Sequence, residues 1–229
     1  MCSIPFIGMR QEMPIRRIQF HFDYLSPYSY LAWHQLREVA ARHDLRVQAE
    51  PTLLAALLNH WGHKGPGEIP SKRLYMFKDC LRTAAALGIP FAPPFSHPFN
   101  PLASLRATLL EMDEDIRADL VMRLFAATWA DSLDVSSPEV VARICADAGV
   151  PDALARIQDP AVKQRLHDAS SEAISLGVFG VPTMIVDGEL FWGMDSLAHL
   201  ERYLRGEDPV RPEDEVKWRA VPITAHRQR

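Results

Sequence analysis

Two serines occupy the turn between an apolar, strand-like segment and a predicted helix, in the stretch HFDYLSPYSYLAW. Ser26 suits the N-cap of that helix, and Pro27 suits its first position, where the missing N–H costs nothing. The positive end of a helix dipole favours a bound anion and lowers the pKa of a thiol held there. Because Ser26 and Ser29 stand where a Cys-x-x-Cys pair would carry its sulfurs, this turn cannot run dithiol–disulfide exchange. From the residues alone, Ser26 is more often a simple cap, and Ser29 is a polar residue of the first turn.

Three other short segments carry groups that could contact a ligand. Val181 precedes Pro182, although the sequence alone does not decide whether that peptide bond is cis. Asp195, in WGMDS, is a natural N-cap for the last predicted helix. In the loop WGHKGPG, His63 can donate one hydrogen bond and Lys64 can hold a carboxylate, although a solvated loop lysine is as common.

Further polar and aromatic residues have weaker patterns. His97 and Asn100, in the proline-rich loop SHPFNP, could both point into a cleft, although a lone loop histidine is more often structural. Asp79 and Arg82 are three residues apart, so we expect them to pair on one helix face. The helical histidines lack metal-ligand spacing, and we expect no metal site. The aromatic residues that could line a substrate site are Trp61, Phe91 and Trp192.

The composition is that of an ordinary globular protein, with 48% apolar residues, 24% charged residues and a formal net charge of -4. No stripe of Lys and Arg indicates nucleic-acid binding. The three cysteines Cys2, Cys80 and Cys145 are far apart, which argues against a disulfide framework. No segment is a signal peptide or is apolar for long enough to span a bilayer, so we expect a cytoplasmic protein.

The element order predicts an α/β, thioredoxin-like fold with a large all-helical insertion. Residues 16–23 alternate like a strand, the helix after Ser26 follows, and residues 45–51 form a second strand, which together make a βαβ unit. Helical periodicity then dominates up to residue 177. Two β-prone runs flank Asp187-Gly188, a strong hairpin signal, and a final helix ends at Gly206.

We expect a single domain over residues 16–205. Its two thioredoxin halves are residues 16–52 and 178–205, and residues 53–177 form the helical insertion. The remaining segments are a leader at 1–15, with Met13 as a possible start, and a loosely docked tail at 206–229.

Several motifs, in this order, resemble the glutathione-dependent members of the DsbA-like thioredoxin superfamily. These are the kappa-class glutathione transferases and the 2-hydroxychromene-2-carboxylate isomerases. The matching segments are FDYLSPYSYLA, HKGPGEIPSKRLYMFKDCLR, LGIPF, HPFNPLASLR, FGVPTM and GMDSLAHLERYL. The combination of SPYSYLA with FGVPTM is specific for the group, and the segments together cover nearly all of residues 17–205.

The resemblance implies that glutathione supplies the missing sulfur. Ser26 would then donate a hydrogen bond to the glutathione thiolate, which makes it the predicted catalytic residue. A cis bond at Val181-Pro182 would present the Val181 backbone to the cysteinyl part of glutathione, and Asp195 would face the γ-glutamyl ammonium. Met194 stands where relatives carry a small polar residue, so one bond to glutathione could be missing.

The loop and pocket residues complete the prediction. His63 stands where relatives often have an Asn that contacts glutathione. Lys64 would hold a carboxylate of glutathione or of the substrate, and Tyr28 and Trp192 would also contact the substrate. The resemblance further implies a homodimer.

We consider three functions, of which the resemblance favours the first and the other two remain alternatives. The first is a glutathione-dependent isomerase that interconverts 2-hydroxychromene-2-carboxylate and trans-o-hydroxybenzylidenepyruvate in the breakdown of aromatic compounds. The second is a kappa-like glutathione transferase that conjugates electrophiles. The third is a glutathione-binding protein of thioredoxin fold without enzymatic activity.

Overall fold

The computed structural model describes residues 16–225, so the expected leader at 1–15 lies outside the described residues. The four strands are β1 (Arg17–Phe22), β2 (Arg46–Pro51), β3 (Thr183–Val186) and β4 (Glu189–Trp192). The thioredoxin halves also contain the helices α1 (Pro27–Arg42) and α9 (Leu197–Leu204) and the 3₁₀ turn η2 (Met194–Ser196). The segment between β2 and β3 contains α2 (Leu54–Trp61), η1 (Pro66–Glu68), α3 (Pro70–Leu87), α4 (Leu102–Thr108), α5 (Glu114–Trp129), α6 (Pro138–Asp147), α7 (Ala153–Arg156) and α8 (Pro160–Ser175).

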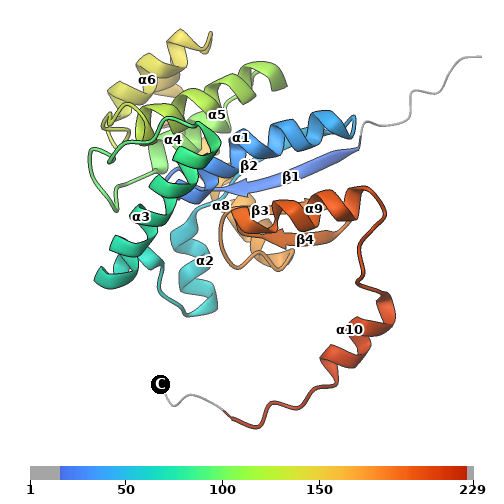
Figure 1. The fold of residues 1–229 in the computed structure, drawn as a ribbon. Helices are drawn as coiled ribbons and strands as arrows, with labels where there is room; N and C mark the ends of the chain where they lie inside the picture. The colour runs from blue at the N-terminus through green and yellow to red at the C-terminus, as the bar shows by residue number, and fades with distance from the viewer. Residues whose placement is uncertain (1–15, 226–229) are drawn as a thin grey trace, which may run out of the picture.

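The sheet has the strand order β2-β1-β3-β4. β1 and β2 run parallel, as a βαβ unit requires, and β3 is antiparallel to both β1 and β4. The β3–β4 hairpin turns at Asp187-Gly188, where both residues have positive φ angles, the conformation that Asp-Gly favours in two-residue turns. The expected α/β thioredoxin-like fold with a helical insertion is therefore confirmed (Figure 1).

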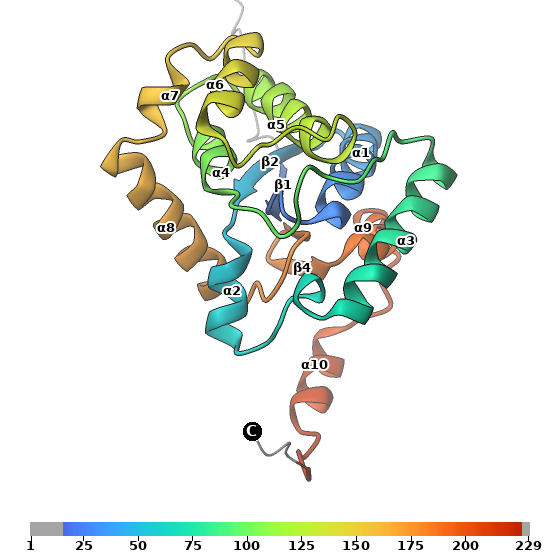
Figure 2. The same ribbon diagram turned by 90° about the vertical axis from the view of Figure 1, so that its left-hand side faces the viewer.

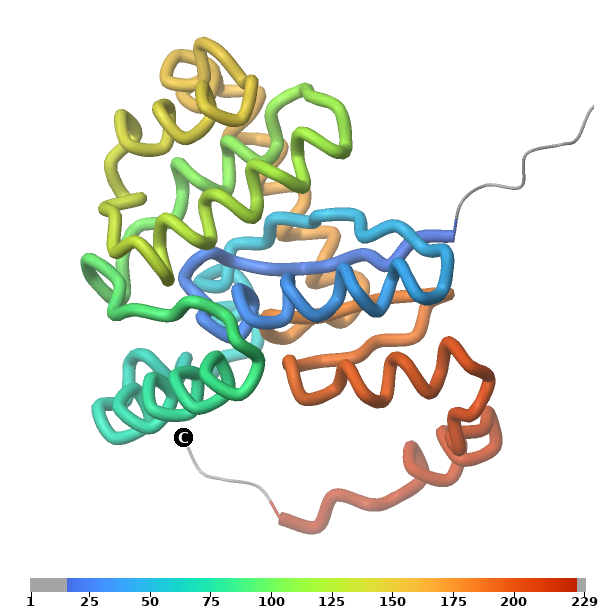
Figure 3. The backbone as a smooth tube through the Cα atoms, turned by 45° about the horizontal axis from the view of Figure 1, so that its top comes forward, coloured from blue at the N-terminus to red at the C-terminus, as the bar shows by residue number. Residues whose placement is uncertain are grey.

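Side chains alternate between the two faces of the sheet because successive residues of a strand point in opposite directions. Phe20 and Phe22 of β1 pack against Trp33 of α1, and Figure 3 shows α1 running along β1. On the opposite face, Ile185 of β3 joins Leu57 and Ala173 of the insertion in a smaller apolar cluster. The sheet is thus covered on both faces.

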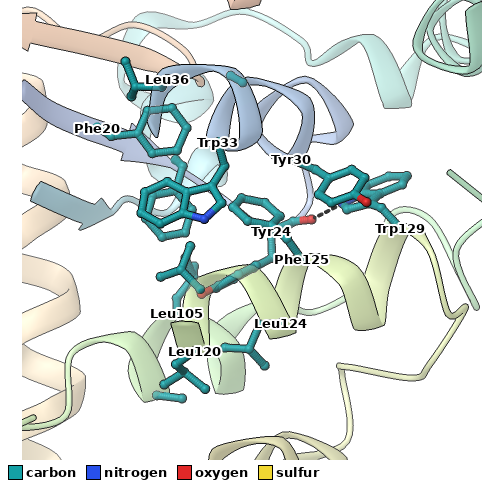
Figure 4. Packing of buried hydrophobic residues seen from close by; sticks show 14 of the residues in the cluster. Phe20, Tyr24, Tyr30, Trp33, Leu36, Leu105, Leu120, Leu124, Phe125 and Trp129 are labelled. Carbon is teal, nitrogen blue, oxygen red and sulfur yellow. Dashed lines mark hydrogen bonds between the residues drawn. The ribbon is translucent and has the colours of Figure 1, made fainter. Parts of the chain in front are cut away.

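The helical insertion shares the main core with the thioredoxin half. Phe125 of α5 lies beside the rings of Phe22, Tyr24 and Tyr30, and the indole N–H of Trp129 donates to the Tyr24 carbonyl at 2.9 Å (Figure 4). The helices α5, α6 and α7 lie at one end of the molecule, and α8 runs from there back to α2 (Figure 2). In the segment between α3 and α4, Phe91 stacks on Trp129 and the Ala92 N–H donates to the Trp129 carbonyl at 2.7 Å, so the same packing positions that segment.

Two expectations about the C-terminal region were wrong or incomplete. Asp195 is not the N-cap of the last helix of the domain, because it lies inside η2 and α9 begins at Leu197. Ser196 closes that turn by donating from its hydroxyl to the Gly193 carbonyl at 2.8 Å. The expected tail contains a further helix, α10 (Pro212–Arg219), which buries none of its residues and extends away from the sheet (Figure 1).

Candidate active site

A pocket of about 550 Å³ lies where the start of α1, the loop before β3 and the region of η1 meet. That volume is typical of a site for a small molecule. Among the residues expected at the site, those that line the pocket are Ser26, Tyr28, His63, Lys64, Val181 and Trp192.

Ser26 caps α1 and keeps one unused hydrogen-bond donor. Its Oγ accepts a hydrogen bond from the Ser29 backbone N–H at 3.2 Å, which confirms the expected cap. The hydroxyl hydrogen has no acceptor among residues 16–225, and Ser26 lines the pocket. It can therefore donate to an anion bound at the positive end of α1.

Asp23 holds the turn in front of Ser26. Its buried carboxylate accepts hydrogen bonds from the N–H groups of Leu25 and Leu54, each at 2.9 Å, and thereby ties the start of α1 to the start of α2. Burial raises the pKa of Asp23 to about 6, although both hydrogen bonds favour the charged form. No motif in the sequence singled out this residue. The available signal was an Asx turn, in which Asp23 bonds to the backbone two residues ahead.

The Val181-Pro182 peptide bond is cis. Val181 lines the pocket, and its backbone N–H and C=O form no hydrogen bond with any of residues 16–225. Pro182 is buried next to it, and its carbonyl accepts from the Gly193 N–H at 2.9 Å. Val181 thus presents a donor and an acceptor that an extended peptide can pair with as a short strand.

Trp192 closes one side of the pocket and is 54% exposed. Its ring lies 5.1 Å from that of Phe179, and it covers Gly180 so closely that a Cβ there would meet the indole nitrogen at 2.8 Å. The two other aromatic candidates lie elsewhere. The indole N–H of Trp61 donates to the Val178 carbonyl, and Phe91 stacks on Trp129.

Tyr28 lines the pocket from α1. Its hydroxyl donates to the Asp79 carboxylate at 2.9 Å. The expected ion pair between Asp79 and Arg82 was wrong, because Asp79 is turned toward α1 and no such pair forms. Burial, reinforced by the neighbouring Cys80 and Asp79, raises the pKa of Tyr28 and keeps it a neutral phenol at pH 7.

His97 lies at the wall of the pocket and contacts the segment before Ser26. Its Nε2 is 3.1 Å from the Leu25 carbonyl, so Nε2 carries the hydrogen and Nδ1 has none in the neutral ring. Burial lowers the pKa of His97, so the ring stays neutral at pH 7. Asn100 does not join it at the pocket and instead accepts from the Leu102 N–H.

Met194 and Asp195 do not line the pocket. The partly buried Met194 packs against the main core, whereas Asp195 is exposed and its carboxylate folds back over Gly193. Their expected contacts with glutathione stay predictions. Among residues 16–225 no three His, Cys, Asp or Glu side chains cluster in a way that could hold a metal ion. No described helix is long and apolar enough to cross a membrane.

Comparison with known proteins gives this geometry a context. The family model of the DSBA-like thioredoxin domain matches residues 17–205. The chain is 31% identical over 193 residues to the 2-hydroxychromene-2-carboxylate isomerase of Sphingobium xenophagum, covering 82% of this chain and 98% of the relative. It is 29% identical over 208 residues to human glutathione S-transferase kappa 1, covering 81% and 90%.

A solved structure of a 2-hydroxychromene-2-carboxylate isomerase superposes with a TM-score of 0.76 at 28% identity, covering 83% of this chain and 95% of that one. The residues matched by the family model, 17–205, include all four strands of the sheet and the cis bond at Pro182. The chain belongs to the DsbA-like thioredoxin family, in the group that contains 2-hydroxychromene-2-carboxylate isomerases and kappa-class glutathione transferases.

Proposed function

We propose that the protein is a glutathione-dependent isomerase that interconverts 2-hydroxychromene-2-carboxylate and trans-o-hydroxybenzylidenepyruvate. The observation that carries this proposal is that Ser26 and Val181 line the same pocket with unused hydrogen-bonding groups. Among residues 16–225, the Ser26 hydroxyl hydrogen has no acceptor and the Val181 backbone N–H and C=O have no partners. The similarity to several isomerases, at 28% to 31% identity, supports this choice of reaction.

The residues present fit glutathione. The backbone of Val181 can pair with the cysteinyl residue of the tripeptide, as in strand addition. His63 can donate to it from the loop after α2, and Lys64 can attract one of its carboxylates. When bound, glutathione supplies a thiolate whose reversible addition to a double bond allows rotation about that bond.

Ser26 performs the central task of the chain in this proposal. Its O–H would donate to the sulfur, and the positive end of the α1 dipole would stabilise a thiolate held there at neutral pH. Tyr28 and Trp192 would bound the space for the aromatic ring. Because Cys80 and Cys145 are buried, and burial raises the pKa of both thiols, neither is suited to act as the nucleophile.

The test is to replace Ser26 by Ala and measure glutathione-dependent isomerisation. Loss of one positioned donor to a developing or bound anion should lower kcat/KM about a hundredfold. Ser29→Ala is the matched control, because it removes a buried hydroxyl that has no hydrogen-bond partner among residues 16–225. Equal activity in wild type and Ser26→Ala would rule out this mechanism.

A kappa-like transferase is the second candidate, favoured by the 29% identity to human glutathione S-transferase kappa 1. Glutathione consumption separates the two reactions, because an isomerase regenerates glutathione and a transferase does not. Net consumption with a chloronitrobenzene, without turnover of the chromene, would favour the transferase. Glutathione binding without either reaction would indicate a non-enzymatic binding protein.

A further inference from the structure

The peptide group that joins Leu25 to Ser26 is held at both of its ends. Its N–H, which belongs to Ser26, donates to the Asp23 carbonyl at 3.0 Å. Its carbonyl, which belongs to Leu25, lies 3.1 Å from Nε2 of His97 and has no other partner among residues 16–225. The first bond is local to the turn, whereas the second comes from a residue 72 positions away in the chain.

The ring of His97 is itself fixed by its surroundings. Its centroid lies 5.2 Å from that of Phe77 and 5.7 Å from that of Trp129. A Cβ on Gly67 would come within 2.8 Å of its Cε1, so η1 also presses on the ring. The His97 backbone carbonyl accepts from the Arg73 guanidinium at 2.9 Å. A ring packed between α3, α5 and η1 has little freedom to move, so its Nε2 is a fixed donor.

The orientation of the Leu25–Ser26 peptide group decides where the Ser26 side chain points. The peptide group is planar, so its rotation changes ψ of Leu25 and φ of Ser26 together. Such a rotation would move Ser26 Oγ, which caps α1 by accepting from the Ser29 N–H at 3.2 Å. A donor that holds the Leu25 carbonyl therefore also holds the Ser26 hydroxyl in place.

His97 lines the pocket, but neither of its ring nitrogens is available to a ligand. Nε2 is used by the Leu25 carbonyl. Nδ1 is buried and has no hydrogen-bond partner among residues 16–225. The polar function of the ring is thus directed at the turn in front of α1.

We propose that His97 is a positioning residue: by holding the Leu25 carbonyl, it keeps the Ser26 hydroxyl directed at the glutathione sulfur. This inference rests on the proposed function, in which Ser26 contacts the sulfur. His97 does not touch the sulfur and acts only through Ser26.

A double-mutant cycle tests whether His97 acts through Ser26. His97→Leu removes the donor but keeps an apolar side chain in the packed site. It should lower kcat/KM for glutathione-dependent isomerisation about tenfold, since a misplacement of about 1 Å can cost about a hundredfold and the cap still restrains Ser26. In the Ser26→Ala background the same change should cost less than about twofold, because no hydroxyl is left to position. Losses that multiply would overturn the proposal.

Two amide variants provide a matched comparison at the same position. His97→Gln can place an amide N–H where Nε2 stands, so it should restore most of the kcat/KM lost in His97→Leu. The shorter His97→Asn reaches only the position of Nδ1, so it should lose as much as His97→Leu. Equal losses in the Gln and Asn variants would contradict a role for the bond to Leu25.

Amide hydrogen exchange in the ligand-free protein separates failure of this inference from failure of the proposed function. The Ser29 N–H, which donates to Ser26 Oγ, reports on the turn. The Leu45 N–H, which donates to the Ala40 carbonyl at 2.9 Å, reports on the far end of α1. His97→Leu should speed exchange at Ser29 severalfold relative to exchange at Leu45, and His97→Gln should not.

If wild type does not isomerise the chromene, the proposed function fails, and the exchange experiment still shows whether His97 holds the turn. An unchanged ratio of the two exchange rates in His97→Leu would overturn the inference even in an active enzyme, because the turn would then keep its shape without the histidine.

Discussion

The turn at the start of α1 is held by a carboxylate that does not line the pocket. Asp23 is fully buried and bonds to the N–H groups of Leu25 and Leu54, so it fixes the turn that carries Ser26. Ser26 in turn caps the helix through the Ser29 N–H. The capping hydroxyl keeps its own hydrogen for the pocket, and one residue can therefore serve both structure and binding.

Asp23→Asn should alter the pH dependence of stability. Because the pKa of Asp23 is about 6 in the folded protein and 3.8 ordinarily, the folded state holds the proton more tightly. Ionisation of the Asp23 carboxyl therefore lowers the free energy of unfolding as pH rises from about 4 to 6, by about 3 kcal/mol in total. Asn cannot ionise. Its NH2 group, which is a donor, would face the donor N–H of Leu54, so the variant should be less stable than wild type at pH 4.

Urea unfolding at several pH values checks this expectation. The difference in free energy of unfolding between wild type and Asp23→Asn should shrink by about 3 kcal/mol between pH 4 and pH 7. Parallel stability curves for the two proteins over this range would contradict the assignment of the shift to Asp23.

At the scale of elements, two glycines allow close approaches at the pocket with different consequences. A Cβ on Gly67 of η1 would meet Cε1 of His97 at 2.8 Å, and that ring is held by the Leu25 carbonyl and packed near Trp129. A Cβ on Gly180 would meet Trp192, which is half exposed and can turn aside.

Gly67→Ala should therefore destabilise the protein more than Gly180→Ala. We expect Gly67→Ala to lower the free energy of unfolding by about 1–3 kcal/mol, because the His97 ring cannot yield. Gly180→Ala should cost less than about 1 kcal/mol, because the neighbour is a movable side chain. Chemical unfolding of both variants measures the difference, and equal losses would show that His97 is not held rigidly.

At the scale of the whole molecule, the insertion and the thioredoxin half meet in one aromatic core. Phe125 of α5 contacts Phe22, Tyr24 and Tyr30, which come from the N-terminal half (Figure 4). We therefore retain the prediction of a single domain over residues 16–205. A homodimer and a cytoplasmic location also stay predictions.

Phe125→Ala tests the single domain. A cavity at this position should lower the free energy of unfolding by about 3–5 kcal/mol. It should destabilise the helical insertion and the thioredoxin part together. Fluorescence and far-UV circular dichroism should then report the same shifted transition. Leu176→Ala, at a 45% exposed position, is the control and should change stability by less than about 0.5 kcal/mol. Two separate transitions in Phe125→Ala would mean that the insertion unfolds independently.

The sequence alone determined the features that depend on neighbouring residues. The cap at Ser26 and the hairpin turn at Asp187-Gly188 were predicted correctly, because capping and turn formation involve groups only a few residues apart. The catalytic role of Ser26 and the cis bond at Val181 came from resemblance. The cis bond is present in the structure, and the catalytic role awaits experiment.

Only the tertiary structure decided which distant groups meet. Local spacing paired Asp79 with Arg82, but Asp79 bonds to Tyr28, which is 51 residues away. Asp195 looked like a cap because its residue type suits one, yet the η2 turn places it before α9 begins. The pocket at Ser26 likewise has walls from both α1 and α3 because these two helices pack against each other. Such contacts depend on how whole helices pack, and no local pattern encodes that packing.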